Sequence, residues 1–198
     1  MCGILGYICL SDKRPDLETF KKSLVLCSSR GTDATGFWTK ETGSIKLDLD
    51  EEDFIKKFEK ELKEGLKSST MIAHCRATTK GTEKNNVNNH PHESEDYVLV
   101  HNGSIFRTDK LKDYNYKGEC DSEIIVSYIQ KYGPQQGLTE MFGSDGMAIA
   151  AVNKKTGMLY LFRNQNPTSL TIDKKNNILY FGSTFDILKP FYRYVKTM

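Results

Sequence analysis

The chain has 198 residues and a formal net charge of +2 at pH 7, which fits a single domain over residues 1–198 with enough material for a sizeable core. Its charges are mixed rather than gathered into a cationic block, and its apolar start is interrupted at Asp12, so we expect no nucleic-acid partner, no signal peptide and no membrane span. An odd number of cysteines without CxxC spacing argues against a disulfide framework and a structural zinc site and predicts a cytoplasmic location; the five are Cys2, Cys9, Cys27, Cys75 and Cys120.

A strand and a helix are expected first in the chain. Residues 3–10 form a short apolar run typical of a buried strand. Residues 16–29 then place apolar side chains at helical spacing, at Leu17, Phe20, Leu24 and Cys27. A helix is therefore expected directly after the first strand.

The next predicted elements are a hairpin and a second helix. Residues 35–40 and 44–50 flank the turn sequence ETG and predict two paired strands. Residues 51–69 are amphipathic, with charges opposite an apolar stripe of Phe54, Phe58 and Leu62. One solvated helix is expected there.

The middle of the chain contains a long polar segment between two predicted strands. Residues 69–77 and 97–106 have the composition of buried strands, and the second runs into a turn. Residues 78–96 are rich in asparagine and nearly featureless, which predicts a long loop, and such loops in compact domains are often functional. A helix is expected over 121–132, with Asp121 as its N-cap.

The last third predicts strands joined by turns, at residues 146–152, 158–164 and 169–183. Strands outnumber helices, and the helices lie between them in the chain. This order favours an α+β fold whose helices cover the faces of the sheet.

Cys2 directly follows the initiator methionine. A small second residue favours removal of Met1, after which Cys2 would carry a thiol and a free α-amine together. An α-amine titrates near ~7.7–8.0 and can accept the proton of a thiol of pKa ~8.5, which is the logic of N-terminal nucleophile enzymes. The structural alternative is a small buried cysteine.

Six short motifs follow in a specific order: MCGILG, RGTDATG, AHCRATTKG, NNHPH, VLVHNGSI and CDSEIIV. Each alone is a common turn or loop sequence. Together, behind an N-terminal cysteine, they resemble the class II glutamine amidotransferases. The motifs that carry the resemblance run from Cys2 to about residue 132. A looser similarity extends to the late strands.

The resemblance implies an αββα sandwich of the N-terminal nucleophile type, with two stacked, largely antiparallel sheets flanked by helices. It implies hydrolysis of the amide of L-glutamine to glutamate and ammonia, with Cys2 as nucleophile. By position, Arg76 matches the arginine that holds the α-carboxylate of glutamine, and Asp121 the acid that receives its α-ammonium. Thr79 is placed with them as a substrate-binding residue. Fork-shaped guanidinium donors suit a planar carboxylate.

The resemblance further implies an oxyanion hole made by the side chain of Asn102 and the backbone N–H of Gly103, where charge develops only in the transition state. Arg30 and Gly31 match residues near the family's cysteine, and we expect them to support the site. His101 and His74 are interpreted as structural histidines.

No metal or cofactor is expected. His90 and His92 could be combined with Cys75 and His74 as ligands, but their spacing matches no common metal site. The reaction implied by the resemblance requires no metal.

The sequence departs from the family at two positions and in one larger respect. Ala77 stands where many members have an aromatic residue, and Lys80 where a histidine or another polar group is usual, so the range of substrates is in doubt. Family enzymes usually continue into a synthase domain, whereas this sequence ends at Met198. We therefore expect ammonia to pass to an acceptor on a separate synthase or ligase subunit.

Two alternatives stay open. A stand-alone hydrolase of another γ-glutamyl amide would use the same cysteine, arginine and aspartate, with Ala77 leaving room beyond the amide. A non-catalytic amino-acid-binding module would keep the pocket and retain Met1, because an amide nitrogen at Cys2 is not a base.

Overall fold

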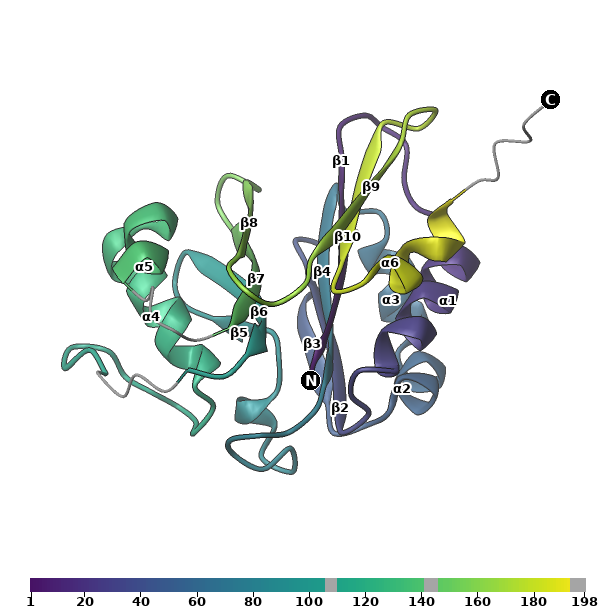
Figure 1. Ribbon diagram of the computed structural model, residues 1–198. Helices are drawn as coiled ribbons and strands as arrows, with labels where there is room; N and C mark the ends of the chain where they lie inside the picture. Colours follow the sequence, from purple (N-terminus) through teal and green to yellow (C-terminus); the bar gives the residue numbers. More distant parts are fainter. Residues whose placement is uncertain (106–109, 141–145, 193–198) are drawn as a thin grey trace.

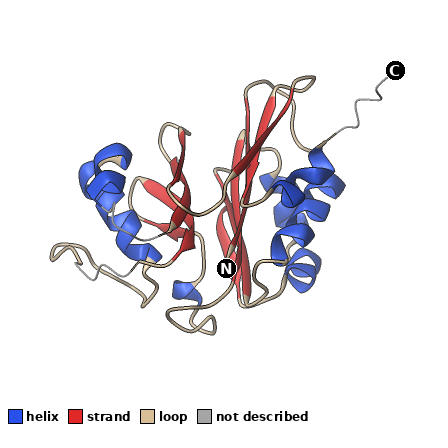
Figure 2. Cartoon of the chain, viewed as in Figure 1, coloured by secondary structure: helices blue, strands red, loops and turns tan. Residues whose placement is uncertain are grey.

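The computed structural model describes residues 1–105, 110–140 and 146–192, and these form four layers. Two antiparallel sheets are stacked face to face, and helices cover the outer face of each sheet (Figures 1 and 2). This architecture agrees with the predicted αββα sandwich. No helix in the described ranges has the length and apolarity needed to cross a lipid bilayer.

The larger sheet has six strands in the order β3-β2-β4-β1-β10-β9. Every neighbouring pair is antiparallel. The predicted first strand and the predicted hairpin both belong to it. The six strands are β1 (Gly3–Cys9), β2 (Ala34–Thr39), β3 (Gly43–Leu47), β4 (Thr70–Arg76), β9 (Ser169–Asp173) and β10 (Ile178–Gly182).

The smaller sheet has four strands in the order β5-β6-β7-β8, again antiparallel throughout. They are β5 (His92–Glu93), β6 (Tyr97–Gly103), β7 (Met147–Asn153) and β8 (Leu159–Arg163). The predicted strand over 97–106 ends at Gly103, and its last residue, Phe106, lies outside the described residues.

Helices α1 (Leu17–Ser28), α2 (Glu51–Lys57), α3 (Glu59–Gly65) and α6 (Phe185–Leu188) lie on the outer side of the larger sheet, followed by the 3-10 turn η2 (Lys189–Phe191) (Figure 1). The single helix predicted over 51–69 is wrong, because the chain leaves helical geometry at Phe58, where φ is −115°. The predicted apolar stripe is nevertheless correct, since Phe54 and Leu62 are buried and Phe58 packs against the same core.

Helices α4 (Ser122–Tyr132) and α5 (Pro134–Glu140) cover the smaller sheet (Figure 1). Asp121 stands at the N-cap position of α4, as predicted, but its side chain does not cap the helix. Asp121 has helical backbone angles and makes no side-chain cap bond. Its Oδ2 accepts a 2.7 Å hydrogen bond from the Ile105 N–H instead. The carboxylate that was expected to cap the helix therefore makes a tertiary contact.

The segment 78–96, predicted as a featureless loop, contains two short elements. A 3-10 turn η1 spans Asn86–Asn88, and His92–Glu93 form edge strand β5 beside β6. Asparagine side chains hold the segment together: Asn88 Nδ2 and Asn89 Nδ2 donate to the carbonyl oxygens of Thr82 and Glu83 at 3.0 and 2.9 Å. The abundance of asparagine therefore reflects side-chain bonds that replace missing secondary structure.

Apolar side chains fill the spaces between all four layers. One cluster packs α1 against the larger sheet, and a second packs α4 and α5 against the smaller one. The third lies between the sheets and contains Ile4, Trp38, Ile72, Val98, Val100, Ala148, Ala150, Val152 and Phe181. Because this inter-sheet layer is closely packed, the ends of β1, β4 and β6 are fixed relative to one another.

Candidate active site

Cys2 lies at the start of β1, beside the end of β4. The register pairs Gly3 with Cys75, which brings Cys2 next to the chain leaving β4 at Ala77. Cys2 Sγ is 3.4 Å from the Ala77 N–H nitrogen and 3.5 Å from the Ala77 oxygen. On the other side, Arg30 Nε donates a 2.8 Å hydrogen bond to the Cys2 carbonyl. The thiol is thus held by strand pairing and by two backbone anchors.

The surroundings of the Cys2 thiol act on its pKa in opposite directions. Burial raises the pKa and dominates, while the hydrogen bond from the Ala77 N–H and the charge of Arg76 act to lower it. A thiol that burial keeps protonated needs a nearby base before it can attack a carbonyl. Met1, which precedes it, is 76% exposed and is within reach of a processing enzyme.

The thiol opens into a cavity of about 390 Å³ between the two sheets' strand ends. Of the predicted site residues, Cys2, Thr79, Asn102 and Gly103 line this cavity together with Ala77. The remaining lining residues are Met1, Ser104, Gly146, Gln165 and Asn166. The predicted nucleophile and the predicted oxyanion donors therefore share one cavity.

Asn102 is buried, being 1% exposed, and neither atom of its side-chain amide has a hydrogen-bond partner among the described residues. An unsatisfied buried amide costs about 1–3 kcal/mol, so its presence at a cavity wall points to an absent partner. Gly103 follows with φ of +152°, and a Cβ there would lie 2.3 Å from the Gly146 oxygen. Glycine is required at this position.

Arg76 is buried beneath the segment 78–96 and does not line the cavity. Its Nη1 donates to Asn89 Oδ1 at 2.7 Å, and its Nη2 donates to the carbonyl oxygens of Lys80 and Gly81 at 2.7 and 2.9 Å. Each edge of a guanidinium that can hold both oxygens of a carboxylate includes Nη2. The predicted carboxylate-binding edge is therefore occupied by the chain's own backbone.

Asp121 is also buried and lies outside the cavity wall. Its carboxylate accepts from the Ile105 N–H at 2.7 Å, yet its charge reaches the Cys2 thiol and acts to raise the pKa of that thiol. Arg76 and Asp121 therefore lie near Cys2, but behind the residues that line the cavity.

Gly31 and the two structural histidines lie behind the site. A Cβ at Gly31 would be 2.3 Å from the Arg76 carbonyl carbon, so the absence of a side chain lets this loop pack on the end of β4. His74 Nε2 is 3.0 Å from the His101 oxygen, and His101 Nδ1 is 2.9 Å from Ser122 Oγ. Burial lowers the pKa of His74 to about 3 and that of His101 to about 4, so both are neutral at pH 7.

Asn166 is a site residue that the sequence reasoning missed. Its Nδ2 donates to the Asn102 oxygen at 2.7 Å and to the Gly146 oxygen at 3.1 Å. It thereby fixes the backbone of the candidate oxyanion residue from a loop more than sixty positions later in the chain. The sequence around it, RNQNPTS, contains no signal beyond a turn.

Comparisons with known proteins agree on one family and one fold. The profile of the family described as "Glutamine amidotransferase domain" matches residues 62–197. The glutamine–fructose-6-phosphate aminotransferases (isomerizing) of Halalkalibacterium halodurans and Shouchella clausii are each 29% identical to this chain, over 194 and 189 residues. These matches cover 90% and 92% of this chain but only 32% and 30% of the relatives, so the chain spans about a third of their length.

Two solved structures share the fold. One is the glutamine phosphoribosylpyrophosphate amidotransferase from B. subtilis complexed with ADP and GMP, with a TM-score of 0.72 at 15% identity, covering 95% of this chain and 43% of that one. The other is described as the allosteric regulatory enzyme of purine biosynthesis, with a TM-score of 0.71 at 17% identity and coverages of 96% and 43%. At these identities the likeness concerns the fold.

Proposed function

Because the chain belongs to the glutamine amidotransferase domain family, we propose that it hydrolyses the side-chain amide of L-glutamine with Cys2 as nucleophile. This membership confirms the resemblance to class II glutamine amidotransferases, and with it the assignment to an enzyme family and to the αββα fold. The roles of individual residues are part of the proposal.

The proposed reaction begins when Met1 has been removed and the α-amine of Cys2 is free. The amine accepts the thiol proton, and the sulfur attacks the amide carbon of glutamine, so a C–S bond forms and the carbonyl π electrons move to oxygen. The amine returns the proton to the leaving nitrogen, ammonia departs, and water then hydrolyses the thioester to glutamate. The amine serves as base and acid in turn.

The charge on oxygen is proposed to be held by Asn102 Nδ2 and the Gly103 N–H. This proposal is carried by one observation: at the wall of the cavity that contains the Cys2 thiol, Asn102 presents a buried amide that no described residue pairs with. A donor fixed in place before the reaction stabilises an oxyanion without reorganisation, and removing one such donor typically costs ~10²–10³ in rate.

We propose that the amino-acid end of glutamine is read by Arg76 and Asp121, with Thr79 nearby. Bidentate binding of the α-carboxylate requires one of the carbonyl oxygens of Lys80 and Gly81 to leave Arg76 Nη2. Both carbonyls belong to the start of the segment 78–96. Substrate binding and a shift of this segment are therefore coupled in the proposal.

The ammonia is proposed to be transferred to an acceptor on a separate synthase or ligase protein in the cytoplasm. The names of the relatives describe an aminotransferase that acts on glutamine and fructose 6-phosphate, and their chains are about three times as long. A second candidate function, hydrolysis of another γ-glutamyl amide, is favoured by one observation: Ala77 lines the cavity and adds little bulk there. A larger leaving group could occupy that side.

The proposed nucleophile is tested by measuring ammonia release from L-glutamine by the wild type, by Cys2→Ala and by a matched Cys9→Ala control. Cys9 is the last residue of β1 and lies outside the cavity. We expect Cys2→Ala to abolish release and Cys9→Ala to retain it. An uncleaved N-terminal extension is expected to be nearly as damaging as Cys2→Ala, because it converts the α-amine into an amide.

Two results would contradict the proposal. Wild-type turnover by folded Cys2→Ala protein would remove Cys2 from the mechanism. Retention of Met1 on active protein from its native host, shown by intact mass, would remove the α-amine as the base. If the wild type releases no ammonia from glutamine but cleaves an N-substituted γ-glutamyl amide, the second candidate function replaces the first.

A further inference from the structure

A cluster of buried side chains that can ligate a metal ion lies outside the cavity of Cys2. The Cys120 thiol donates to Asp121 Oδ1 at 3.8 Å. His90, His92 and Cys120 each offer one ligand atom, and these three atoms lie within 4.8 Å of one another. All three residues are buried, with exposed fractions of 4%, 3% and 6%. From the sequence, Cys75 was the cysteine weighed as a ligand together with these histidines. In the structure, the cysteine beside them is Cys120.

Three of the four imidazole nitrogens of His90 and His92 have no hydrogen-bond partner in the part of the chain that the structure describes. Both ring nitrogens of His90 and the Nε2 of His92 are buried without a hydrogen bond among the described residues. A neutral imidazole has one nitrogen with a free lone pair, so each of the two rings can give one nitrogen to a metal ion. A buried nitrogen without a partner points to an absent one.

The surroundings fix the two rings and their backbone. His74 stacks on His90 with ring centroids 3.9 Å apart, and His90 meets His92 edge to face at 4.6 Å. Lys46 Nζ donates to the carbonyl oxygens of Asn89 and Pro91 at 2.6 and 2.8 Å, on either side of His90. The ligand atoms are therefore carried by a braced backbone rather than by a free loop.

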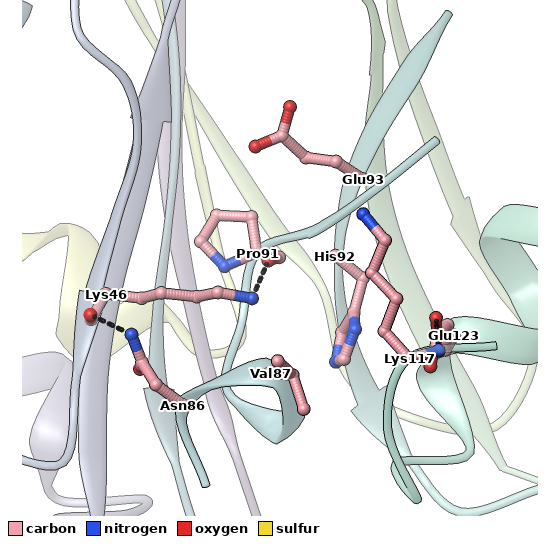
Figure 3. Close-up of a pocket in the computed structure, with 8 residues that line it drawn as sticks. All are labelled: Lys46, Asn86, Val87, Pro91, His92, Glu93, Lys117 and Glu123. Atoms are coloured by element: carbon pink, nitrogen blue, oxygen red, sulfur yellow. Dashed lines mark hydrogen bonds between the residues drawn. The ribbon is translucent and has the colours of Figure 1, made fainter. Parts of the chain in front are cut away.

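Nearby charges of both signs act on the cluster. Arg76 and Lys46 are positive and act on the two rings, and Asp121 is negative and acts on the Cys120 thiol. Loss of the Cys120 proton on binding would cancel one of the two positive charges that a divalent ion brings. A pocket of about 280 Å³ reaches His92 from the surface, and its lining includes Lys46, Lys117 and Glu123 (Figure 3). It offers an ion a route to the ligands.

We propose that His90, His92 and Cys120 form a zinc site that fastens the segment 78–96 to the start of α4. Two imidazoles and a thiolate are a ligand set that Zn²⁺ binds at ~2.0–2.3 Å, which places ligand atoms roughly 3.3–3.8 Å apart. Closing the site from its present dimensions needs inward movements of about 1 Å. The Cys120 proton is released on binding, and the fourth position is open to water from the pocket.

The site is tested by titrating metal-free full-length protein with Co²⁺, and then with Zn²⁺ in competition. A thiolate ligand gives Co²⁺ an intense near-ultraviolet charge-transfer band. We expect one Co²⁺ per chain with this band in the wild type and in the matched control Cys9→Ser. We expect Cys120→Ser to lose the band and His92→Ala to bind at least tenfold more weakly. Zn²⁺ should displace Co²⁺ and raise the melting temperature of the wild type but not of Cys120→Ser.

Circular dichroism of each metal-free variant establishes that it is folded. Absence of stoichiometric Co²⁺ uptake by the folded wild type would overturn the proposal. So would a band that survives in Cys120→Ser, and a band that disappears in Cys2→Ala would assign the ion to the nucleophile instead. None of these measurements uses glutaminase activity, so the zinc site and the proposed function can fail independently.

Discussion

The polar groups near Cys2 divide into those that line the cavity and those that lie behind it. Asn102 lines the cavity with an amide that has no partner among the described residues, whereas the Asp121 carboxylate lies deeper and already accepts from the Ile105 N–H and the Cys120 thiol. A group that meets charge formed only in the transition state affects kcat, and a group that holds an unchanging part of the substrate affects KM. The two positions should therefore separate kinetically.

We predict that Asn102→Ala lowers kcat for glutamine hydrolysis by ~10²–10³ with little change in KM. Asp121→Asn is predicted to raise KM with a smaller effect on kcat, because the α-ammonium keeps its charge throughout the reaction. Steady-state ammonia release over a range of glutamine concentrations separates the two parameters. An Asn102→Ala variant altered only in KM would show that the oxyanion site is elsewhere.

Asn166 is predicted to be a positioning residue that acts through Asn102. Asn166→Ala and Asn166→Asp both remove the Nδ2 donor to the Asn102 and Gly146 oxygens, so both should lower kcat more than they raise KM. The aspartate variant preserves size but also turns a negative charge toward the two carbonyl oxygens, so it should be the more damaging of the two. Activity of Asn166→Asp equal to that of the wild type would leave Asn166 with a packing role only.

At the scale of residues, sequence motifs identified the lining groups but not their present partners. Cys2, Asn102 and Gly103 were predicted together and share one cavity. The hydrogen bonds of Arg76 to Lys80 and Gly81 could not be predicted, because they depend on how a long loop folds back over β4. Asn166 was missed for the same reason: it approaches Asn102 only after the smaller sheet has formed.

Helix α1 begins with an N-cap that local sequence specifies. Asp16 has extended backbone angles, and its Oδ2 accepts from the Thr19 N–H at 2.8 Å and from Thr19 Oγ1 at 2.6 Å. These bonds satisfy one of the free N–H groups of the first turn and place a negative charge at the positive end of the helix. Phe20 and Leu24 then face the larger sheet.

We predict that Asp16→Ala lowers the free energy of unfolding by about 1 kcal/mol at pH 7, measured by denaturant titration. Asp16→Asn keeps a side-chain acceptor and should lose less. An Asp12→Ala control, with no cap bond to remove, should leave stability unchanged. A destabilisation of Asp12→Ala equal to that of Asp16→Ala would attribute the effect to general charge instead of to the cap.

The Asp16 carboxylate also predicts that the free energy of unfolding depends on pH. The hydrogen bonds from Thr19 hold the pKa of Asp16 below its usual value, so its contribution to stability is present above the unfolded value of ~3.9. It is lost as the pH falls through the lower pKa of the folded state. The stability difference between the wild type and Asp16→Asn should therefore shrink between about pH 5 and pH 3. A difference that grows over this range would contradict the assignment.

At the scale of elements, the periodicity of apolar residues predicted which face of a segment is buried better than where the segment ends. Phe54 and Leu62 were placed correctly on the buried stripe of residues 51–69, yet the helix divides at Phe58. The sequence KFEK around this point contains no glycine or proline, so no local signal marks the division. Strand β5 escaped prediction because its two residues are too few to show a period.

At the scale of the whole molecule, the site depends on both sheets at once. The larger sheet supplies Cys2 and Arg76, and the smaller one supplies Asn102 and Gly103. The inter-sheet core between them, with Val100 and Phe181 buried, holds these groups in register. The segment 78–96 begins at the end of β4 in the larger sheet and ends at β6 of the smaller one. A shift of this segment can therefore move residues in both halves of the site.

A partner that moves the start of this segment away from Arg76 is therefore predicted to accelerate hydrolysis. In the chain alone, the carbonyl oxygens of Lys80 and Gly81 occupy Arg76 Nη2, and Ala77 leaves one side of the cavity without an aromatic cover. We expect slow glutamine turnover by the isolated chain and a severalfold or larger increase in kcat when an acceptor-bearing protein docks, because closure aligns the donors and excludes water. The rate is measured with and without the proteins encoded beside this chain.

Two further measurements make this prediction decisive. Pairing each candidate partner with Cys2→Ala shows whether any gain in ammonia release comes from the partner's own chemistry. Trypsin cleavage after the exposed Lys80 and Lys84 should slow when the true partner is bound, since both lysines lie in the segment that the partner is expected to contact. An isolated chain that already turns over glutamine at ~10 s⁻¹ or faster, with no response to any neighbour, would contradict the subunit proposal and favour a stand-alone amidohydrolase.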